Sequence, residues 1–391
     1  MTPPPYRASR RLLLGAGAAA GAGWLALLAG LFLDPARTCF AYLAAYLYVL
    51  TIALGALCLV MIAHASNARW FVVVRRVAEA AIATLPLLAL LFVPLFFALG
   101  RLYPWVPPLD HLGAEAREVI EKKQAYLNVP FFVVRSLVYL AVWSVLALVL
   151  RGWSLRQDRD ASRPLGWAAG VSGAGLMLFG FTETFAAFDW IMSLSATWQS
   201  TMFGVYVFAG AMVGGLAAMV VLTRTFEHTG ALDHAVAASH YHALGRLLLT
   251  FVVFWAYIAY SQSFLIWIAD LPHETRWVLD RVHGGWGWLF LLLGLGHFAL
   301  PFLLLLWRSN KRSGARLAAI GAWLLLMHYV DVFWLVLPAL HGGGTFHWLD
   351  APALLAVCGT TVAFGAWMAS GHPLVPLHDD RLAAAVRYES P

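Results

Sequence analysis

Stretches of about 20 apolar residues recur along the whole chain, and this recurrence constrains the fold more than any other feature. A helix of about 20 apolar residues is long enough to cross the hydrocarbon core of a bilayer. Only 12% of the 391 residues are charged, against about 25% in soluble domains. The sequence therefore predicts an all-α integral membrane protein. Its ten predicted transmembrane helices cover residues 11–33, 38–63, 77–99, 130–151, 165–187, 200–223, 246–269, 284–307, 316–337 and 351–369.

These spans divide the chain into four segments. We expect an N-terminal transmembrane helix in residues 1–37, a four-helix bundle in 38–187, a second four-helix bundle in 188–340, and a last helix with a cytoplasmic tail in 341–391. A faint repeat supports the two bundles, because Glu183 in GFTETFAAFDW aligns with Asp331 in HYVDVFWLV. Units with an even number of helices are parallel repeats. The long outer loop 100–129 is either a docking surface or a solvated cap with a short amphipathic helix.

The basic residues indicate how the chain is oriented. Most of them fall in short connections on one side of the predicted membrane, such as Arg75, Arg76, Lys311 and Arg312. The positive-inside rule makes this side cytoplasmic, and an even number of helices places both termini there. This orientation explains the formal net charge of +6 without a nucleic-acid partner. The basic start resembles a signal peptide, but its apolar run is too long, so we expect a retained first helix.

Three ionisable residues at membrane depth are the main candidates for function. His328 and Asp331 lie near the middle of the span 317–337 and are three residues apart, so they share one helix face. An aspartate at that depth costs about 2.5–3.5 kcal/mol on insertion scales, and such residues usually face the protein interior. His297 lies at a similar depth in the preceding span, where Pro301 predicts a kink. Imidazoles beside a carboxylate are suited to relaying protons and to binding a quinol hydroxyl.

Two other interpretations of these three residues stay open. The polar groups are also compatible with a purely structural role, in which they only specify how the helices pack. A haem held by His297 and His328 is less consistent with the sequence, because histidines do not recur here at regular spacing.

A second set of polar residues lies toward the predicted outer face. Arg135 enters the fourth span from that side, and Glu183 lies near the outer end of the fifth, so we expect the two to form an ion pair across adjacent helices. Such a pair either fixes the helix register or lines a polar pocket. Asp189, in a short outer loop, is a candidate exit site for protons.

Further candidates for a proton path lie elsewhere in the membrane. Glu79 is at the inner end of the third span and is a possible uptake site for protons, although Arg75 and Arg76 beside it also explain it as a neutralised charge. Tyr257 and Tyr260 belong to a hydroxyl-rich face of the seventh span. This face either lines a water path or supplies hydrogen bonds between helices.

The cysteines do not form a metal site in the sequence. Cys39, Cys58 and Cys358 have no metal-binding spacing, and no motif for an iron–sulfur cluster or for covalent haem attachment is present. We therefore expect no covalently bound cofactor and no metal in this chain, so that any such redox centre belongs to a partner.

Six segments carry a resemblance to a known family. They are RRVAEA with LPLLALLFVPL (75–95), KKQAYLNVPFFVVRSLVYLAVW (122–143), FDWIMSLSATWQSTMFGVYVFAG (188–210), FVVFWAYIAYSQSFLIWIADLPHET (251–275), GHFALPFLLLLWRSNKR (296–312) and MHYVDVFWLVLP (327–338). In these segments the chain resembles the NrfD/PsrC-like membrane proteins of the polysulfide reductase family, and in particular the second NrfD-like subunit of bacterial alternative complex III.

The resemblance implies both a fold and a function. The fold is two four-helix bundles flanked by the first and last of ten helices. The function is that of a subunit of a quinol:cytochrome c oxidoreductase in the electron transport chain of the bacterial inner membrane. The subunit would form a quinone-facing or proton-conducting pocket that includes His297, His328 and Asp331, without a redox centre of its own.

The resemblance also implies partners: a second NrfD-like subunit, an iron–sulfur protein and c-type cytochromes, which would hold the clusters and haems. Whether this subunit itself takes part in catalysis stays open. The alternatives are a structural docking subunit and a proton-coupled transporter.

Overall fold

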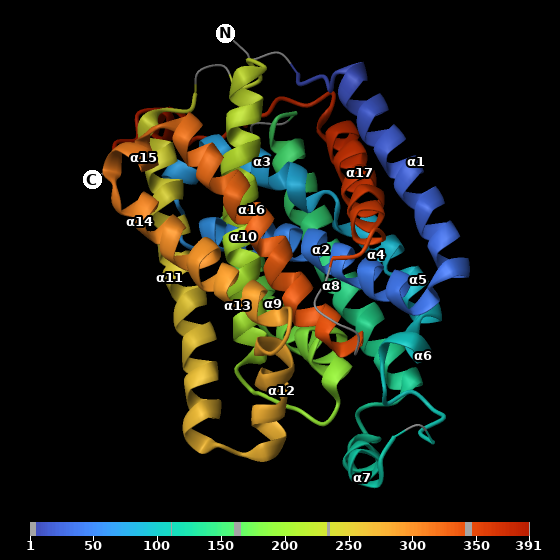
Figure 1. Cartoon of the computed structure of the whole chain (residues 1–391). Coiled ribbons are helices and arrows are strands. Elements are labelled where there is room, and N and C mark those ends of the chain that lie inside the picture. The colour runs from blue at the N-terminus through green and yellow to red at the C-terminus, as the bar shows by residue number, and fades with distance from the viewer. Residues whose placement is uncertain (1–4, 111, 160–165, 233–234, 341–345, 391) are drawn as a thin grey trace.

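The computed structural model describes residues 5–110, 112–159, 166–232, 235–340 and 346–390. Within these ranges every regular element is helical, and ten helices are long and apolar enough to cross a membrane, so the predicted fold class is confirmed (Figure 1). The first residue of the predicted span 165–187 and residues 341–345 of the predicted last segment lie outside the described residues. The ten spans are α1 (Arg10–Leu33), α2 (Pro35–Ala65), Arg69–Phe97, α8 (Val129–Gln157), Gly166–Ser195, α10 (Phe203–His228), α11 (Ala238–Ala269), Trp286–Leu306, Gly314–Leu340 and α17 (Asp350–Ala369).

Four of the spans consist of more than one helical element. The third span contains η1 (Arg69–Phe71), α3 (Val72–Ile82), α4 (Leu85–Leu91) and α5 (Val93–Phe97), and the fifth contains α9 (Gly166–Trp190) and η2 (Met192–Ser195). The eighth span contains α13 (Trp286–Leu292), η3 (Leu293–Ala299) and α14 (Leu300–Leu306), and the ninth contains α16 (Gly314–Val336) and η4 (Leu337–Leu340). Short helices outside the spans are α6 (Leu99–Leu102), α7 (Ala114–Lys123), α12 (Pro272–Val282), α15 (Arg308–Arg312) and α18 (Leu382–Val386).

Prolines explain the interruptions in the third and eighth spans. Pro86 and Pro94 stand in the first turns of α4 and α5, where their missing N–H groups cost least. Pro301 cannot donate to the carbonyl of His297, four residues earlier. The predicted disturbance at this point takes the form of η3, a π-helical segment that contains His297. Such segments are often found at functional sites.

The spans pack as two rings of four helices. In the first ring α2 contacts α3 and α9, and α8 contacts α4 and α9. In the second ring α10 contacts α11 and α16, and the eighth span closes the ring by contacting both α11 and α16. The rings meet where α2 packs on α10 and α16, so these three helices are the most buried in the chain, whereas α1 and α17 pack against each other at one side.

Two glycines bring the rings together. A Cβ placed at Gly55 of α2 would lie 2.0 Å from the carbonyl oxygen of Ala211, and one at Gly215 of α10 would lie 2.7 Å from the carbonyl carbon of Gly55. The two backbones are therefore in direct contact at this crossing. Small residues allow this close approach in membranes, where van der Waals packing rather than the hydrophobic effect holds helices together.

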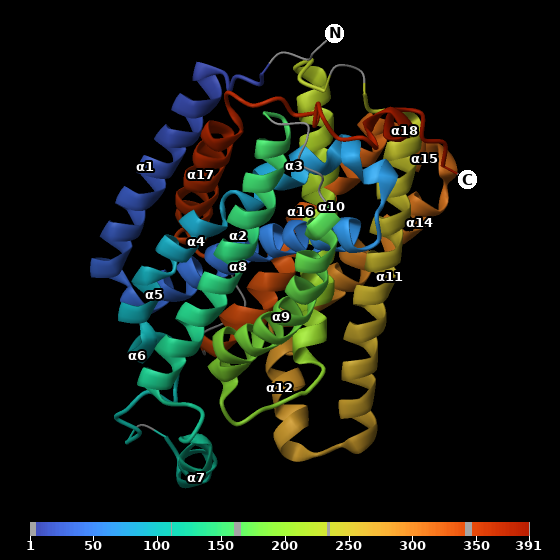
Figure 2. The same ribbon diagram turned by 180° about the vertical axis from the view of Figure 1, so that it is seen from behind.

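The two ends of the bundle differ. The segment after α17, residues 371–390, lies across the end that also holds the start of α1, and we call this segment the tail and this end the tail end. Tyr6 ties the chain's two ends together, because its N–H donates to the carbonyl of His372 and its own carbonyl accepts from Gly371. Helices α7 and α12 lie at the opposite end, the loop end, in both views (Figures 1 and 2).

Candidate functional site

Asp331 lies at the centre of the second ring with both carboxylate oxygens engaged. The hydroxyl of Tyr206, on α10, donates to Oδ1 at 2.5 Å, and the indole Nε1–H of Trp255, on α11, donates to Oδ2 at 3.1 Å. Asp331 itself is on α16 and is 2% exposed. A carboxylate that cannot reach water is thus held by donors from two other helices, as a buried acid requires.

His328 lies one helical turn before Asp331 and connects the two rings. Its Nε2 is 2.8 Å from Oγ1 of Thr51 on α2, and the Thr51 hydroxyl lies 2.8 Å from the carbonyl of Leu47. Since the Thr51 proton goes to that carbonyl, its oxygen accepts from Nε2–H of His328, which assigns the tautomer. Nδ1 of His328 is then an acceptor, and it has no partner among the described residues.

Two glycines of α10 make room for this imidazole. A Cβ at Gly214 would lie 2.8 Å from Cδ2 of His328, closer than real contacts allow, and 3.0 Å from its Nε2. One turn earlier, a Cβ at Gly210 would lie 3.4 Å from Oδ2 of Asp331 and 3.7 Å from Nδ1 of His328. His328 and Asp331 therefore both pack against the α10 backbone at these two glycines.

His297 joins the cluster through Trp255. The imidazole and the indole stack with their ring centroids 4.1 Å apart and their planes 9° from parallel. His297 is fully buried, and neither ring nitrogen has a hydrogen-bond partner in the described part of the chain. The structure thus brings together all three main candidates, with Trp255 contacting His297 by its ring and Asp331 by its N–H.

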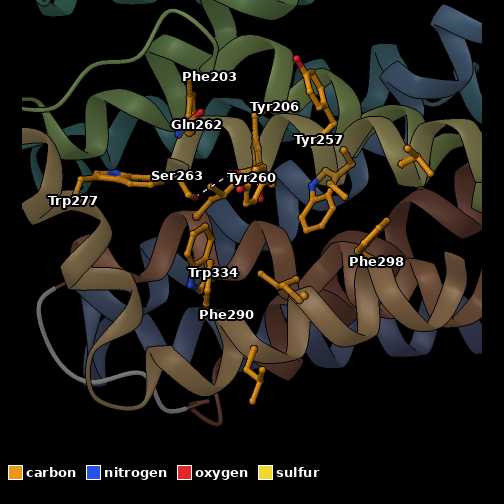
Figure 3. Close-up of a pocket in the computed structure, with 18 residues that line it drawn as sticks. Phe203, Tyr206, Tyr257, Tyr260, Gln262, Ser263, Trp277, Phe290, Phe298 and Trp334 are labelled. Carbon is orange, nitrogen blue, oxygen red and sulfur yellow. Dashed lines mark hydrogen bonds between the residues drawn. The ribbon is translucent and has the colours of Figure 1, made fainter. Parts of the chain in front are cut away.

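An apolar cavity of about 560 Å³ adjoins the cluster. Tyr206 and Trp255 stand in its wall, so Asp331 lies directly behind the two side chains that bond to it. We call it the aromatic cavity, and Figure 3 shows the side chains that border it. Its lining comes from α10, α11, α12, α16 and the eighth span: Phe203, Tyr206, Val253, Trp255, Ala256, Tyr257, Ala259, Tyr260, Gln262, Ser263, Trp277, Phe290, Leu291, Leu293, Gly294, Phe298, Trp334 and Leu335.

The aromatic cavity opens sideways, toward the lipid. Tyr257 and Tyr260 of α11 line it and are 64% and 66% exposed, and on the facing eighth span Phe290 and Leu291 are also exposed. The predicted proton-path residues Tyr257 and Tyr260 consequently lie at the rim of the cavity and not inside the helix bundle. The cavity therefore borders the exposed surface of the bundle between α11 and the eighth span.

Tyr206 and Trp255 were not predicted as site residues. A tryptophan or tyrosine in a membrane protein is usually placed at the interface. Trp255 lies well inside α11, and that position is the signal that would have identified it. Tyr206 lies in the first turn of α10, where a tyrosine is ordinary, so the sequence carries no such signal for it.

The predicted ion pair between Arg135 and Glu183 is wrong. Arg135 instead binds Asp189 through two hydrogen bonds of 2.8 and 2.9 Å, and Tyr139 donates to the same carboxylate. In a helix the Cα–Cβ bond tilts toward the N-terminus, so Arg135 on α8 extends to the loop end while Glu183 on α9 tilts away from it. Asp189, predicted as a proton exit, is thus fully buried in an ion pair.

Glu183 is left without an ionic partner in the described ranges. It is 4% exposed, and its Oε1 has no hydrogen-bond partner there. It lies in the first ring, whereas Asp331 lies in the second, so the structure does not bring these two acids into one site. Its predicted part in a proton path stays a prediction.

Glu79 belongs to a buried charge cluster at the tail end. Its carboxylate is 3.3 Å from Nε of Arg75 and 3.4 Å from Nε of Arg76, and these arginines also bind Asp379 and Asp158. This geometry agrees with neutralisation of Glu79 by the arginines. The tail covers the cluster, since Asp379 is one of its residues.

Asp379 fastens the tail. Burial alone would raise the pKa of this carboxyl, but hydrogen bonds from Arg381 and the charge of Arg75 hold it below its usual range. Its Oδ2 lies 2.6 Å from Nη1 of Arg75. The carboxylate is therefore charged at neutral pH and holds the tail against α3.

The next question is whether the described residues could bind a metal ion. Among the described residues no group of three or more His, Cys, Asp and Glu side chains is arranged to hold a metal ion. The haem interpretation fits the geometry poorly, because Nε2 of His328 is bonded to Thr51 and its ring lies against the backbone of α10.

The fold and the site together define the class of protein. The described ranges hold ten long apolar helices, with buried polar groups inside the bundle and an apolar exterior, and this makes the chain a multi-pass integral membrane protein. No protein-family model and no curated protein matches the chain. Any function must accordingly be argued from the geometry of the site.

Proposed function

We propose that this chain is the membrane subunit of a quinol:cytochrome c-type oxidoreductase and that the aromatic cavity receives the quinol ring. One observation carries the proposal: an apolar cavity open to the lipid ends at a tyrosine hydroxyl that is bonded to a buried carboxylate. A quinol is an apolar molecule of the membrane with two ionisable hydroxyl groups. Its ring suits the aromatic lining, and its hydroxyl suits Tyr206.

Oxidation of a quinol releases two protons and two electrons, and each needs an acceptor. In the proposed mechanism a quinol hydroxyl gives its proton to the oxygen of Tyr206 while the proton of Tyr206 passes to Oδ1 of Asp331. Proton transfer by a positioned group of this kind typically contributes about 10²–10⁴-fold to a rate. We assign the second proton to His297, whose two ring nitrogens have no hydrogen-bond partner among the residues that the structure describes.

The two electrons leave the chain. The resemblance to the NrfD/PsrC-like proteins supports iron–sulfur and haem centres on partner subunits as the electron acceptors. The same resemblance supports a second NrfD-like subunit, an iron–sulfur protein and c-type cytochromes as partners in a bacterial inner membrane. The distribution of arginine and lysine favours a cytoplasmic tail end. Purification in mild detergent, with mass spectrometry of the copurifying chains, tests the partners.

The test of the pocket uses the assembled complex purified from its native membrane. Asp331→Asn and Tyr206→Phe keep the shapes of the side chains but remove the proton acceptor and the relay. We expect both variants to assemble and to lose quinol-dependent turnover by about 10² or more. Tyr46→Phe is the matched control, because this buried hydroxyl lies outside the cavity and has no hydrogen-bond partner in the described residues. Full turnover in both site variants would refute the proposal.

A structural subunit is the second candidate, and the bond between His328 and Thr51 favours it. This bond joins the two rings inside the membrane, as a group that specifies packing would. In that case Asp331→Asn and His328→Gln would lower the amount of assembled complex, and the turnover of each remaining complex would be unchanged.

A further inference from the structure

A second cavity lies on the opposite side of the cluster, toward the tail end. It encloses about 510 Å³ between the α1–α17 pair and the core helices α2, α3 and α10. We call it the α17 crevice, because residues of α17 form one of its walls. Its lining is mostly apolar and consists of Tyr6, Leu12, Tyr48, Val49, Ile52, Ala53, Ala80, Ala81, Thr84, Ala218, Val221, Leu222, Thr225, Phe226, Leu325, Cys358, Thr361, Val362, Gly365 and Ala366.

The hydroxyl groups in the lining are largely occupied. Thr84, Thr225 and Thr361 each donate to a carbonyl of their own helix, three or four residues earlier. The crevice therefore differs from the aromatic cavity, where Tyr206 and Trp255 point their donors at a carboxylate. Its interior suits a hydrocarbon chain.

Positive charge lies next to two lining residues of the α17 crevice along the chain. Tyr6 and Leu12 line the crevice, Arg7 follows Tyr6 directly, and Arg10 and Arg11 precede Leu12. All three arginines are exposed, and none forms an ion pair within the described residues.

Some arginines at this end differ from these three, although Arg308 and Arg312 also form no ion pair within the described residues. Arg75, Arg76, Arg224 and Arg381 each have an acidic partner. The charge beside the crevice is therefore available for an anion at the membrane surface.

We infer that the α17 crevice binds a phospholipid with an anionic headgroup. One acyl chain occupies the apolar interior, and the headgroup phosphate lies among Arg7, Arg10 and Arg11. Charge complementarity identifies this occupant, because the crevice combines an uncharged interior with three unmatched cations at one end. The bound lipid packs the α1–α17 pair onto the core. This inference does not depend on quinol binding.

Native mass spectrometry of the full-length protein in nanodiscs tests the inference, with phosphatidylglycerol and phosphatidylcholine as the two probe lipids. We expect one phosphatidylglycerol to remain bound to the wild type after the nanodisc is removed, and phosphatidylcholine to be lost. Arg7→Gln with Arg11→Gln should weaken retention about 30-fold, which corresponds to about 2 kcal/mol at about 1 kcal/mol per basic residue near the surface. These two positions are exposed, so the change leaves the core intact.

Two further variants make the test specific. Ala366→Phe fills the crevice from α17 and should abolish retention while all three arginines stay in place. Arg308→Gln with Arg312→Gln removes the same charge from the tail end, away from the crevice, and should retain the lipid. The inference would be overturned if the wild type retained both lipids equally, or if the two arginine double variants lost the lipid equally. It would also be overturned if Ala366→Phe retained the lipid as well as the wild type does, or if the bound mass were that of a quinone.

Discussion

Replacing Gly214 by alanine tests the packing on which the polar cluster depends. The new methyl group would lie 2.8 Å from Cδ2 and 3.0 Å from Nε2 of His328, and the ring of Tyr48 stands near the imidazole. The imidazole can move away only by giving up its 2.8 Å hydrogen bond to Thr51. Overpacking of this kind costs about 1–3 kcal/mol, and the lost hydrogen bond about 0.5–1.5 kcal/mol.

Gly210 supplies the matched control one turn away on the same helix. A methyl group there meets Asp331 at 3.4 Å and His328 at 3.5 Å, which are ordinary contact distances. Both substitutions gain the same helix propensity, about 1 kcal/mol, so this term cancels when the two variants are compared. We expect Gly214→Ala to have a free energy of unfolding about 2–4 kcal/mol below that of Gly210→Ala.

The assay is the free energy of unfolding in bicelles, measured by steric trapping. A Thr51→Val background should reduce the difference between the alanine variants by about 1 kcal/mol, because the hydrogen bond is then already absent. If Gly214→Ala proved as stable as Gly210→Ala, the close seating of His328 against α10 would be refuted.

Other predictions concern the ion pairs. Arg135→Gln should lower the free energy of unfolding by about 3–5 kcal/mol, because it leaves the Asp189 carboxylate buried without its partner. Lys122→Gln breaks an exposed ion pair and should change the free energy of unfolding little. Equal decreases in the free energy of unfolding of the two variants, measured by denaturation, would contradict this prediction. Asp379→Asn should free the tail for limited proteolysis, whereas its exposed neighbour Asp380→Asn should leave the tail protected. The folded-state pKa of Asp379 is lowered, so its contribution is complete above the unfolded pKa of about 3.9 and is lost only as the pH falls further. Tail protection should therefore be constant from about pH 5 to pH 8, and a loss within that range would contradict the assignment.

Most of the fold was predictable because length and hydropathy decide it. An apolar run near 20 residues has few alternatives to a transmembrane helix, since a helix satisfies its own backbone hydrogen bonds in lipid. The breaks at Pro86 and Pro94 follow from the missing N–H of proline. The contact between Gly55 and Gly215 was not predictable, because hydropathy does not say which faces of two helices meet.

The site was predictable in part. His297, His328 and Asp331 lie at similar depth in neighbouring spans, and from this the sequence alone predicts that they are close together. Tyr206 and Trp255 come from other spans and reach Asp331 only because the second ring closes. Arg135 was paired with the wrong acid because depth along the helix axis ignores the tilt of side chains toward the helix N-terminus.

The pairing of the first span with the last has a consequence for how the chain is made. Arg37, at the start of α2, is buried and bonded at 2.6 Å to Asp350, the first residue of α17, against which α1 also packs. During synthesis α1 and Arg37 enter the membrane long before α17 exists. From the insertion of α2 until that of α17 this guanidinium has no Asp350 to bind, and α1 lies in the lipid without the helix against which it packs. Release of α17 from the translation machinery is thus the step that lets the bundle close, and ribosome stalling before Asp350 should leave a chain that quality-control proteases recognise.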